Sequence, residues 1–553
     1  MTLFKKFKIA LTPEERKNRN IELLLGLSSG ILLGISFPPI PLWFLSFFAF
    51  IPYFYVIEKR EGLGAINRFT YFTMFFFNLI TLYWVGSWTK DADPFLMISG
   101  SVLLFFNPLL FLIPSTLYHF ARKSFSKNIA LLSFPLFWVS YEYLYSITDF
   151  RFPWLILGNS QSYNLIFVQI ADVIGANGLS LLIIFINISF YLIVKDYIAG
   201  KKFSSKQIAV SILLITLPYL YGNYRYNSLE FTGSKIKVGV VQPNLNPWKK
   251  WEAGNLSEQL DLYLSLSKET LKNKADLVIW PESSLPVYLF SSNYPNEVNE
   301  IHKFVDSNKI MLLTGMPHIE FFKENDAPKY AKKTNSGNYL YTSYNSVLFI
   351  QPNKRKIDFY GKIKLVPFGE KVPLVEYVPY IGDLLRWNVG ISSWNDGSDT
   401  VVFSGKLNGI QDSIKPAGVI CIESIYPDFV AQFVDKGANL LTVVTNDSWY
   451  GNSSGPYQHK EISVLRAIEN RRYLVRAANG GISCVIDPFG NTLVATKMFT
   501  KDTFVEEVTL INEKSFYTNN PMIIPYLSLA FSVWVFAFFW FRKYSNGEKF
   551  KNE

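Results

Sequence analysis

Three side chains of the sequence together have the chemistry of covalent acyl transfer. Cys421 lies in the apolar run "AGVICIE", Glu282 ends the apolar run "ADLVIWPE", and Lys362 lies in "YGKIKLVPFGEKVP". A thiolate can attack a carbonyl carbon, a carboxylate can accept the thiol proton, and a cation can stabilise the resulting oxyanion. Functional groups of α/β proteins gather where strands end, so we expect the three groups to meet if these runs are neighbouring strands.

Each of the three residues also has an ordinary structural interpretation. A free cysteine is among the most buried residue types, so Cys421 alone is compatible with simple core packing. Glu282 can cap a turn after "WP", and Lys362 can be a solvated lysine. Lys364, two residues away, is an alternative candidate for the cation. The second cysteine, Cys484, has only the packing interpretation. A free thiol has a pKa of about 8.5, so the chemical interpretation requires a base nearby.

The elements that would position these residues follow from the hydrophobic pattern. Helical spacing of apolar residues occurs over 255–274 and 456–478. The strand-like runs are apolar through their length, which is typical of sheets covered on both faces and predicts a layered α/β arrangement. These runs are 235–243, 275–282, 309–317, 344–350, 417–423, 438–447 and 481–490.

The chain as a whole has the composition of a membrane protein. Of the 553 residues, 49% are hydrophobic and 17% aromatic. This is too apolar for a typical soluble enzyme. Runs of about 17–25 apolar residues can cross a bilayer as helices, and the sequence predicts eight such spans. They are 21–37, 39–57, 69–88, 97–120, 129–146, 166–194, 207–221 and 521–541.

The distribution of Lys and Arg predicts the orientation of these spans. The N-terminal stretch, the C-terminal tail and alternate short loops are rich in Lys and Arg, whereas the loops on the other side hold only Lys90 and Arg151. Positive loops face the cytoplasm, so both termini are expected there and the segment between the last two spans outside it. The net charge of +10 is thereby explained without nucleic acid as a partner. With two cysteines, a disulfide framework is not expected in the outer segment.

A resemblance to a known family rests on four motifs in a fixed order. "WPES" is followed by a lysine with "LVPFGE" three residues later, then by "CIES" and "NDSWYG". This order resembles the nitrilase, or carbon-nitrogen hydrolase, superfamily. Together with the eight spans, nearly the whole chain resembles the apolipoprotein N-acyltransferase family. The resemblance implies a membrane domain over 1–225, an extracytoplasmic nitrilase-like αββα sandwich over 226–515, and a final span with a basic tail over 516–553.

The resemblance also implies an activity and a location. Members of the family move an acyl chain from a phospholipid onto the enzyme cysteine, and then to the amino group of a diacylglyceryl-cysteine at the N-terminus of an apolipoprotein. Glu282 would be the general base, Lys362 the oxyanion-stabilising cation and Cys421 the nucleophile. We expect a multi-pass protein of the bacterial cytoplasmic membrane, active as a monomer on phospholipid and apolipoprotein. We see no metal-ligand cluster or phosphate-binding glycine loop and expect no cofactor.

Further residues match family positions. Glu370 and Glu423 match additional carboxylates that support the triad. The sequence departs from the family at Ile422, where many members have a tyrosine after the nucleophile, so a role for that hydroxyl is not expected here. The apolar stretch 372–394 predicts a lid that dips into the membrane interface. The candidate substrate-binding residues are Trp251, Trp387, Asn446 and Trp449.

Two other functions are compatible with parts of the pattern. A membrane-anchored amidase or nitrilase would use the same triad with water as the final acceptor, but it would not need eight spans or apolar lids. A transporter or receptor would bind a ligand in the outer domain without chemistry, and its function would be indifferent to replacement of Cys421.

Overall fold

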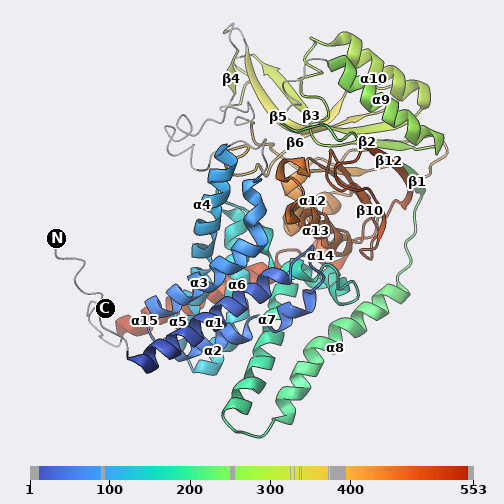
Figure 1. Cartoon of the computed structure of the whole chain (residues 1–553). Coiled ribbons are helices and arrows are strands. Elements are labelled where there is room, and N and C mark those ends of the chain that lie inside the picture. The colour runs from blue at the N-terminus through green and yellow to red at the C-terminus, as the bar shows by residue number, and fades with distance from the viewer. Residues whose placement is uncertain are drawn as a thin grey trace.

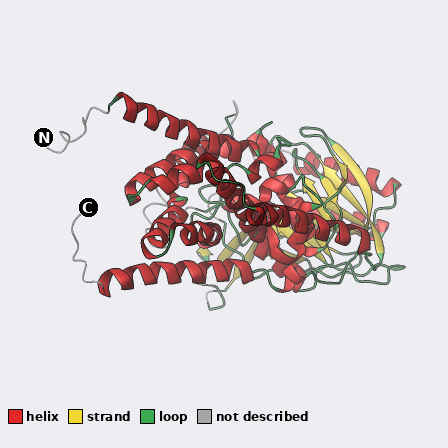
Figure 2. Cartoon of the chain, turned by 90° about the horizontal axis from the view of Figure 1, so that it is seen from below, coloured by secondary structure: helices red, strands yellow, loops and turns green. Residues whose placement is uncertain are grey.

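The computed structural model contains a helical domain and a two-sheet domain stacked on it (Figure 1). The structure describes residues 12–88, 94–248, 256–323, 325–328, 331–334, 337, 339–371, 373 and 394–545. Figures 1 and 2 show that the first turn of α1 and the last turn of α15 lie at the end of the helical domain remote from the sheets.

The helical domain is built from long apolar helices. Within the described part of the chain, four stretches are long and apolar enough to cross a membrane, namely Leu63–Gly86, Leu96–Ser124, Phe167–Ile198 and Ile523–Ser545. Helices α1 and α3 pack closely because Gly26, Gly30 and Gly34 line one face of α1, and a Cβ at Gly30 would lie 2.4 Å from the backbone oxygen of Thr73. The helices are α1 (Pro13–Ile35), α2 (Ile51–Lys59), α3 (Leu63–Leu82), α4 (Pro94–Leu110), α5 (Leu112–Ser124), α6 (Lys127–Ile147), α7 (Ala171–Ile198), α8 (Ser205–Ser228) and α15 (Ile523–Ser545).

The prediction of a membrane span over 39–57 is wrong. The segment forms the short 3-10 helix η1 (Trp43–Phe47) and then the nine-residue α2. Prolines at 39, 41 and 52 remove backbone donors and prevent one continuous helix. Irregular backbone within a membrane domain needs internal hydrogen-bond partners. Asn187 of α7 supplies two, because it accepts from the backbone N–H of Phe50 at 2.9 Å and donates to the backbone oxygen of Ser46 at 2.7 Å.

Two sheets form the second domain. The larger sheet has the strand order β12-β1-β2-β3-β5-β4, with β6 also paired to β5, and the smaller sheet has the order β11-β10-β9-β8-β7. Strands β7, β8 and β9 run parallel and are buried along their whole length. The strands are β1 (Lys235–Gln242), β2 (Leu277–Trp280), β3 (Met311–Phe322), β4 (Lys332–Lys333), β5 (Leu340–Ile350), β6 (Asp358–Gly361), β7 (Pro416–Ile420), β8 (Leu440–Thr445), β9 (Leu474–Ala478), β10 (Cys484–Ile486), β11 (Thr492–Ala495) and β12 (Asp502–Thr509).

Helices cover the outer faces of both sheets, as the predicted αββα sandwich requires. Alternate residues of β2 face opposite ways: Val278 and Trp280 pack with α9 (Leu256–Lys272) and α10 (Pro295–Asn308), while Leu277 and Ile279 belong to the core shared with the smaller sheet. Helices α12 (Pro427–Asp435) and α13 (Ser454–Asn470) contact the smaller sheet, and the short α14 (Phe516–Asn519) lies beside them.

The predicted helix over 456–478 is too long. Helix α13 ends at Asn470, because Arg471 adopts a left-handed conformation with φ 49°. Residues 474–478 form strand β9 instead. The helical spacing of apolar residues continues through "YLV", but a buried strand has the same apolar composition and the pattern does not separate the two.

The two domains are joined by buried charges. Arg471, at the end of α13, donates to Asp172 at the start of α7 at 2.8 Å and to the backbone oxygen of Gln169 at 3.0 Å. Arg225 of α8 reaches the same carboxylate at 2.8 Å. Asp172 and Arg471 are both buried, so each needs the other to compensate for its lost hydration.

Replacement of Arg471 should therefore loosen the domain junction. In Arg471→Met, the buried Asp172 keeps only Arg225 as a cationic partner, and we expect a loss of about 3 kcal/mol of stability. The thermal unfolding midpoint in detergent micelles measures this loss. Arg355→Met is the matched control, since Arg355 pairs with Asp306 but is 65% exposed; it should cost less than about 1 kcal/mol. Equal midpoints for the two variants would contradict a buried clamp.

Candidate active site

The structure brings the three predicted catalytic residues together at the carboxyl ends of strands. Glu282 lies two residues beyond β2, Lys362 directly follows β6, and Cys421 directly follows β7. The first two strands belong to the larger sheet and the third to the smaller sheet. Gly315 of β3 allows the chain at Glu282 to approach closely, because a Cβ there would lie 2.5 Å from the Cα of Glu282.

Lys362 is buried between two carboxylates. Its Nζ lies 2.8 Å from Glu370 Oε2 and 3.3 Å from Glu282 Oε1, and its side chain is 1% exposed. The amide of Asn345 donates to Oε1 of both carboxylates, at 2.8 Å to Glu282 and 2.9 Å to Glu370. The backbone oxygen of Asn345 also accepts from the backbone N–H of Lys362 at 2.8 Å. One neutral side chain thus holds two acids on either side of one cation.

The two carboxylates keep the lysine charged. Burial alone would lower the pKa of Lys362, but the negative charges of Glu370 and Glu282 outweigh burial and raise that pKa above its ordinary value. A permanent cation in a buried position can stabilise an oxyanion without first taking up a proton. The predicted role of Glu370 as a supporting carboxylate is consistent with this geometry.

Cys421 occupies a strained backbone position. Its φ is 49°, in the left-handed region that side chains with a Cβ rarely adopt. The turn that follows, η6 (Cys421–Ile425), is anchored by the fully buried Glu423. This carboxylate accepts from Tyr360 Oη at 2.6 Å, from the backbone N–H groups of Ile363 and Lys364 at 2.7 and 3.1 Å, and from that of Ile420 at 2.9 Å. Glu423 therefore ties the nucleophile turn to the lysine segment.

The surroundings of Cys421 favour the protonated thiol. Burial raises its pKa above the ordinary value, and the charges of Glu282 and Asp447 raise it further. The charge of Lys362 and a hydrogen bond from Thr445 act in the opposite direction without cancelling the effect. The thiol therefore needs a base at the moment of attack, and the carboxylate of Glu282 is the one whose charge acts on it most strongly.

A second buried network lies beneath the nucleophile, and the sequence did not reveal it. His459 of α13 contacts Ser424 Oγ at 2.8 Å and the backbone oxygen of Cys421 at 3.1 Å through Nε2, and Asp447 Oδ1 at 2.9 Å through Nδ1. Arg476 of β9 donates to Asp447 Oδ2 and lies 3.0 Å from His459 Nδ1. Burial would raise the pKa of Asp447, but the guanidinium of Arg476 and the hydrogen bond with His459 hold that pKa below its usual range. We call Asp447, His459 and Arg476 the nucleophile brace.

Proximity alone would allow Cys421 and two residues of the brace to hold a metal. The ligand atoms of Cys421, Asp447 and His459 lie within 4.8 Å of one another. However, Arg476 already contacts both Asp447 and His459, so its guanidinium supplies the positive charge that a metal would bring and would repel a second cation. The donor set is better suited to holding the Cys421 turn than to ligating an ion. The "NDSWYG" motif pointed to Asp447, but no spacing rule linked it to His459 or Arg476.

The predicted substrate-binding residues fall into two groups. Trp251 and Trp387, and nearly all of the predicted lid 372–394, lie outside the described residues. Asn446 is buried and accepts from Asn479 at 3.2 Å. Trp449 is partly exposed and packs against Trp248, with ring centroids 4.7 Å apart. Substrate binding by these residues stays a prediction. Ile422, which replaces the usual family tyrosine, is 3% exposed and packs in the core.

The helical domain forms part of the floor of the site. Trp84 and Trp154 both donate through Nε1 to Gln458 Oε1, at 3.2 and 2.8 Å. The Trp84 ring also packs edge-on against Tyr450, and the Trp154 ring lies 5.3 Å from the His459 ring. Side chains of the helical domain therefore touch the segment that carries the brace.

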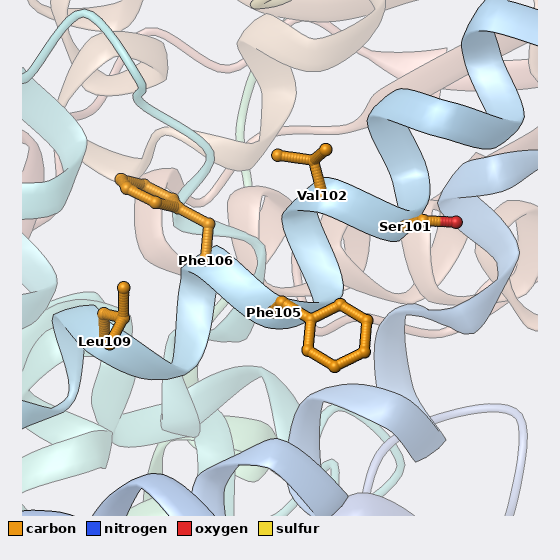
Figure 3. A pocket seen from close by; sticks show the side chains of 5 residues that line it. All are labelled: Ser101, Val102, Phe105, Phe106 and Leu109. Atoms are coloured by element: carbon orange, nitrogen blue, oxygen red, sulfur yellow. The ribbon is translucent and has the colours of Figure 1, made fainter. Parts of the chain in front are cut away.

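An apolar hollow runs along α4. It has a volume of about 410 Å³, and Figure 3 shows its lining residues on successive turns of the helix. From it, aromatic rings continue toward the site: Phe106 lies 5.5 Å from Phe150, and Phe150 lies 6.2 Å from Phe368 in the segment after Lys362. The lining residues are Ser101, Val102, Phe105, Phe106 and Leu109.

Comparisons with known proteins agree with both domains. The carbon-nitrogen hydrolase family model matches residues 237–515, and the apolipoprotein N-acyltransferase N-terminal domain model matches residues 29–189. A protein of Chlorobaculum tepidum named apolipoprotein N-acyltransferase is 34% identical over 92% of this chain and 94% of its own length. One of the same name from Geobacter metallireducens is 31% identical, over 94% and 96%.

Solved structures were compared with the chain as well. Saccharomyces cerevisiae Nit3, a member of branch 10 of the nitrilase superfamily, is 17% identical with a TM-score of 0.35, and the match covers 53% of this chain and 96% of that one.

Loss of the Asp447 charge should destabilise the brace. In Asp447→Asn, Arg476 and His459 remain buried without their carboxylate, and we expect a loss of about 3–5 kcal/mol of stability. Thermal unfolding in detergent micelles measures it. Asp435→Asn is the control, because Asp435 forms an exposed ion pair with Lys514 and should change stability by less than about 1 kcal/mol. An Asp447→Asn variant as stable as this control would refute the brace.

The raised pKa of Cys421 predicts a specific pH dependence of alkylation. In a Cys484→Ser background, only Cys421 can react with iodoacetamide, and reaction proceeds through the thiolate. Below the pKa, the thiolate fraction rises about tenfold per pH unit, so the alkylation rate should climb from pH 7 to pH 9 without levelling. A plateau that begins below pH 8 would instead mean that Lys362 stabilises a resting thiolate.

Proposed function

The chain belongs to the apolipoprotein N-acyltransferase family, and from this premise we propose how its own residues carry out the transfer. Cys421 accepts an acyl chain from a membrane phospholipid as a thioester and passes it to the N-terminal amino group of a diacylglyceryl-cysteine on an apolipoprotein. The observation that supports this proposal most directly is the buried Lys362, held between Glu282 and Glu370 beside a strained Cys421.

In the first half-reaction, the sulfur attacks the ester carbonyl of the phospholipid. Glu282 takes the thiol proton as the carbon–sulfur bond forms, and Lys362 donates to the oxyanion of the tetrahedral intermediate. When the intermediate collapses, the ester carbon–oxygen bond breaks and the proton on Glu282 passes to the departing lysophospholipid alkoxide. The products are an acyl-thioester on Cys421 and a lysophospholipid. Because the thiol pKa is raised, proton transfer to Glu282 accompanies attack.

In the second half-reaction, the neutral amine of the apolipoprotein cysteine attacks the thioester. Glu282 accepts a proton from the amine, Lys362 again stabilises the oxyanion, and the carbon–sulfur bond breaks. The proton then returns to the sulfur, which restores the Cys421 thiol. The first product leaves before the second substrate reacts, so the kinetics should be ping-pong.

A membrane-anchored amidase remains the second candidate function, since water could accept the acyl group in the same site. The family model that matches residues 29–189 favours transfer, because it belongs to the N-terminal domain of acyltransferases. The contacts of Trp84 and Trp154 with Gln458 favour it as well. They build the helical domain into the floor of the site, and a small-molecule hydrolase has no need of this arrangement.

We further propose the placement of the protein in the membrane. The helical domain, about 1–225 with the final segment 516–553, anchors the chain in the cytoplasmic membrane with both termini inside. The domain over 226–515 then lies on the extracytoplasmic side. The positive loops support this orientation, and so does the position of the outer turns of α1 and α15, far from the sheets (Figure 2). We propose that the enzyme works as a monomer.

Detection of the acyl-enzyme tests the proposed function. Purified protein incubated with acyl-labelled phospholipid, without acceptor, should acquire one hydroxylamine-sensitive label on Cys421. Cys421→Ala should acquire none, whereas Cys484→Ser should be labelled like the wild type because Cys484 is a core residue. Addition of a diacylglyceryl-cysteine peptide should then transfer the label to the peptide. Label released to water at the same rate with and without peptide would identify a hydrolase instead.

A further inference from the structure

Two cations beside the active site have no anionic partner among the described residues. Arg151, from the loop after α6, makes a single side-chain hydrogen bond within the described part of the chain, from Nη2 to the backbone oxygen of Ile363 at 3.4 Å. Lys364 places its Nζ over the rings of Tyr426 and Phe429, 5.4 and 5.5 Å from their centroids. Both side chains are half-buried, so water compensates only part of their charge.

The two cations are fixed in the same small region. Ile363, which accepts from Arg151, is the residue before Lys364, and Tyr426 touches both, since its hydroxyl donates to the backbone oxygen of Arg151 at 3.1 Å. Burial lowers the pKa of Lys364 below its ordinary value, and the positive charge of Arg151 lowers it further. Two like charges held together in this way would be stabilised by a bound anion.

Nearby carboxylates do not supply that anion. Glu423 is saturated by the four hydrogen bonds already described, and Asp396 pairs with Lys371 at 2.6 Å. Asp428 lies in the first turn of α12, where backbone N–H groups stabilise it, and burial raises its pKa. These three carboxylates act on Lys364 only at longer range than an ion pair.

The surroundings of the cations suit an amphiphilic ligand. The ring of Phe150, next to Arg151, packs at a tilt against Phe106 of the α4 hollow and against Phe368. Apolar surface that leads from a membrane helix thus meets paired positive charge next to the triad. A phospholipid has the same order of parts, because its phosphate lies within a few bonds of the acyl esters.

We propose that Arg151 and Lys364 form a subsite for the phosphodiester of the acyl-donor phospholipid, which places the neighbouring ester carbonyl at Cys421. The guanidinium donates to phosphate oxygens in a forked geometry, and the ammonium adds a second, point-like charge. The subsite rests on the proposed function and deepens it. It concerns the first half-reaction only, since the apolipoprotein acceptor carries no phosphate at the reacting end.

The test compares two donors with the same acyl chain. Dipalmitoyl phosphatidylethanolamine carries the phosphate, and p-nitrophenyl palmitate does not; acylation of Cys421 is followed for both in detergent micelles. Arg151→Gln and Lys364→Gln should each lower kcat/KM for acylation by the phospholipid by about tenfold and leave acylation by the ester unchanged. Lys364→Arg should recover most of the loss. Lys406→Gln, which removes an exposed cation elsewhere on the same domain, should match the wild type on both donors.

Three outcomes would overturn the subsite. Equal losses on both donors would mean that the residues support the triad or the fold. Wild-type rates with the phospholipid would mean that the cations bind no phosphate of the donor. If the variants kept the wild-type preference between the two donors but bound inorganic phosphate more weakly, the two cations would form a site for the free ion. Failure of the wild type to form any thioester from the phospholipid, while the ester acylates Cys421, would instead reject the proposed function itself.

Discussion

The burial of one ammonium group between two carboxylates sets the requirements for the rest of the catalytic domain. Removing an ion from water costs several kcal/mol, and the cost is recovered only if opposite charges lie at contact distance and the remaining donors are satisfied. Lys362 meets this condition because Glu282, Glu370 and Asn345 arrive from different elements. A shift of any one strand end would leave an uncompensated buried charge. The sheet edge must therefore be rigid, and its fully buried strands provide the rigidity.

Helix α13 connects the active site to the helical domain. At its first turns, Gln458 receives hydrogen bonds from Trp84 and Trp154, and His459 contacts the backbone of the nucleophile. At its other end, Glu469 accepts from the backbone N–H of Ala176, and Arg471 reaches Asp172. One helix thus contacts the nucleophile turn near its start and α7 of the helical domain at its end. The position of Cys421 is fixed relative to the helical domain as well as to the sheets.

Sequence reasoning succeeded where local pattern and ordered motifs carried the information. The strands that carry Glu282 and Cys421 were predictable because they are apolar runs that stop in polar residues. No strand was predicted before Lys362, and only the family order of motifs linked this lysine to the other two residues. Prediction from the sequence failed where tertiary contacts determine the structure. His459 and Arg476 lie in segments whose apolar residues indicate only core packing. The prolines at 39, 41 and 52 interrupt a segment whose apolar composition predicts a membrane span. The strand at 474–478 looked helical because only the short turn 471–473, which begins with the left-handed Arg471, separates it from α13.

The irregular segments of the helical domain explain why that domain does more than anchor the enzyme. The stretch from Phe150 to Gln161 is not a regular helix, yet much of it is buried, so its backbone needs side-chain partners. Glu142 accepts from the N–H of Leu157, Ser180 accepts from that of Gly158, and Gln161 donates to the backbone oxygen of Trp43 in the other irregular segment. These polar residues are costly inside an apolar domain. What they stabilise is a platform that presents Arg151 and Trp154 to the catalytic domain. The same sheets without this platform would keep the charged cluster around Lys362 but would lose the surface through which a lipid could approach it.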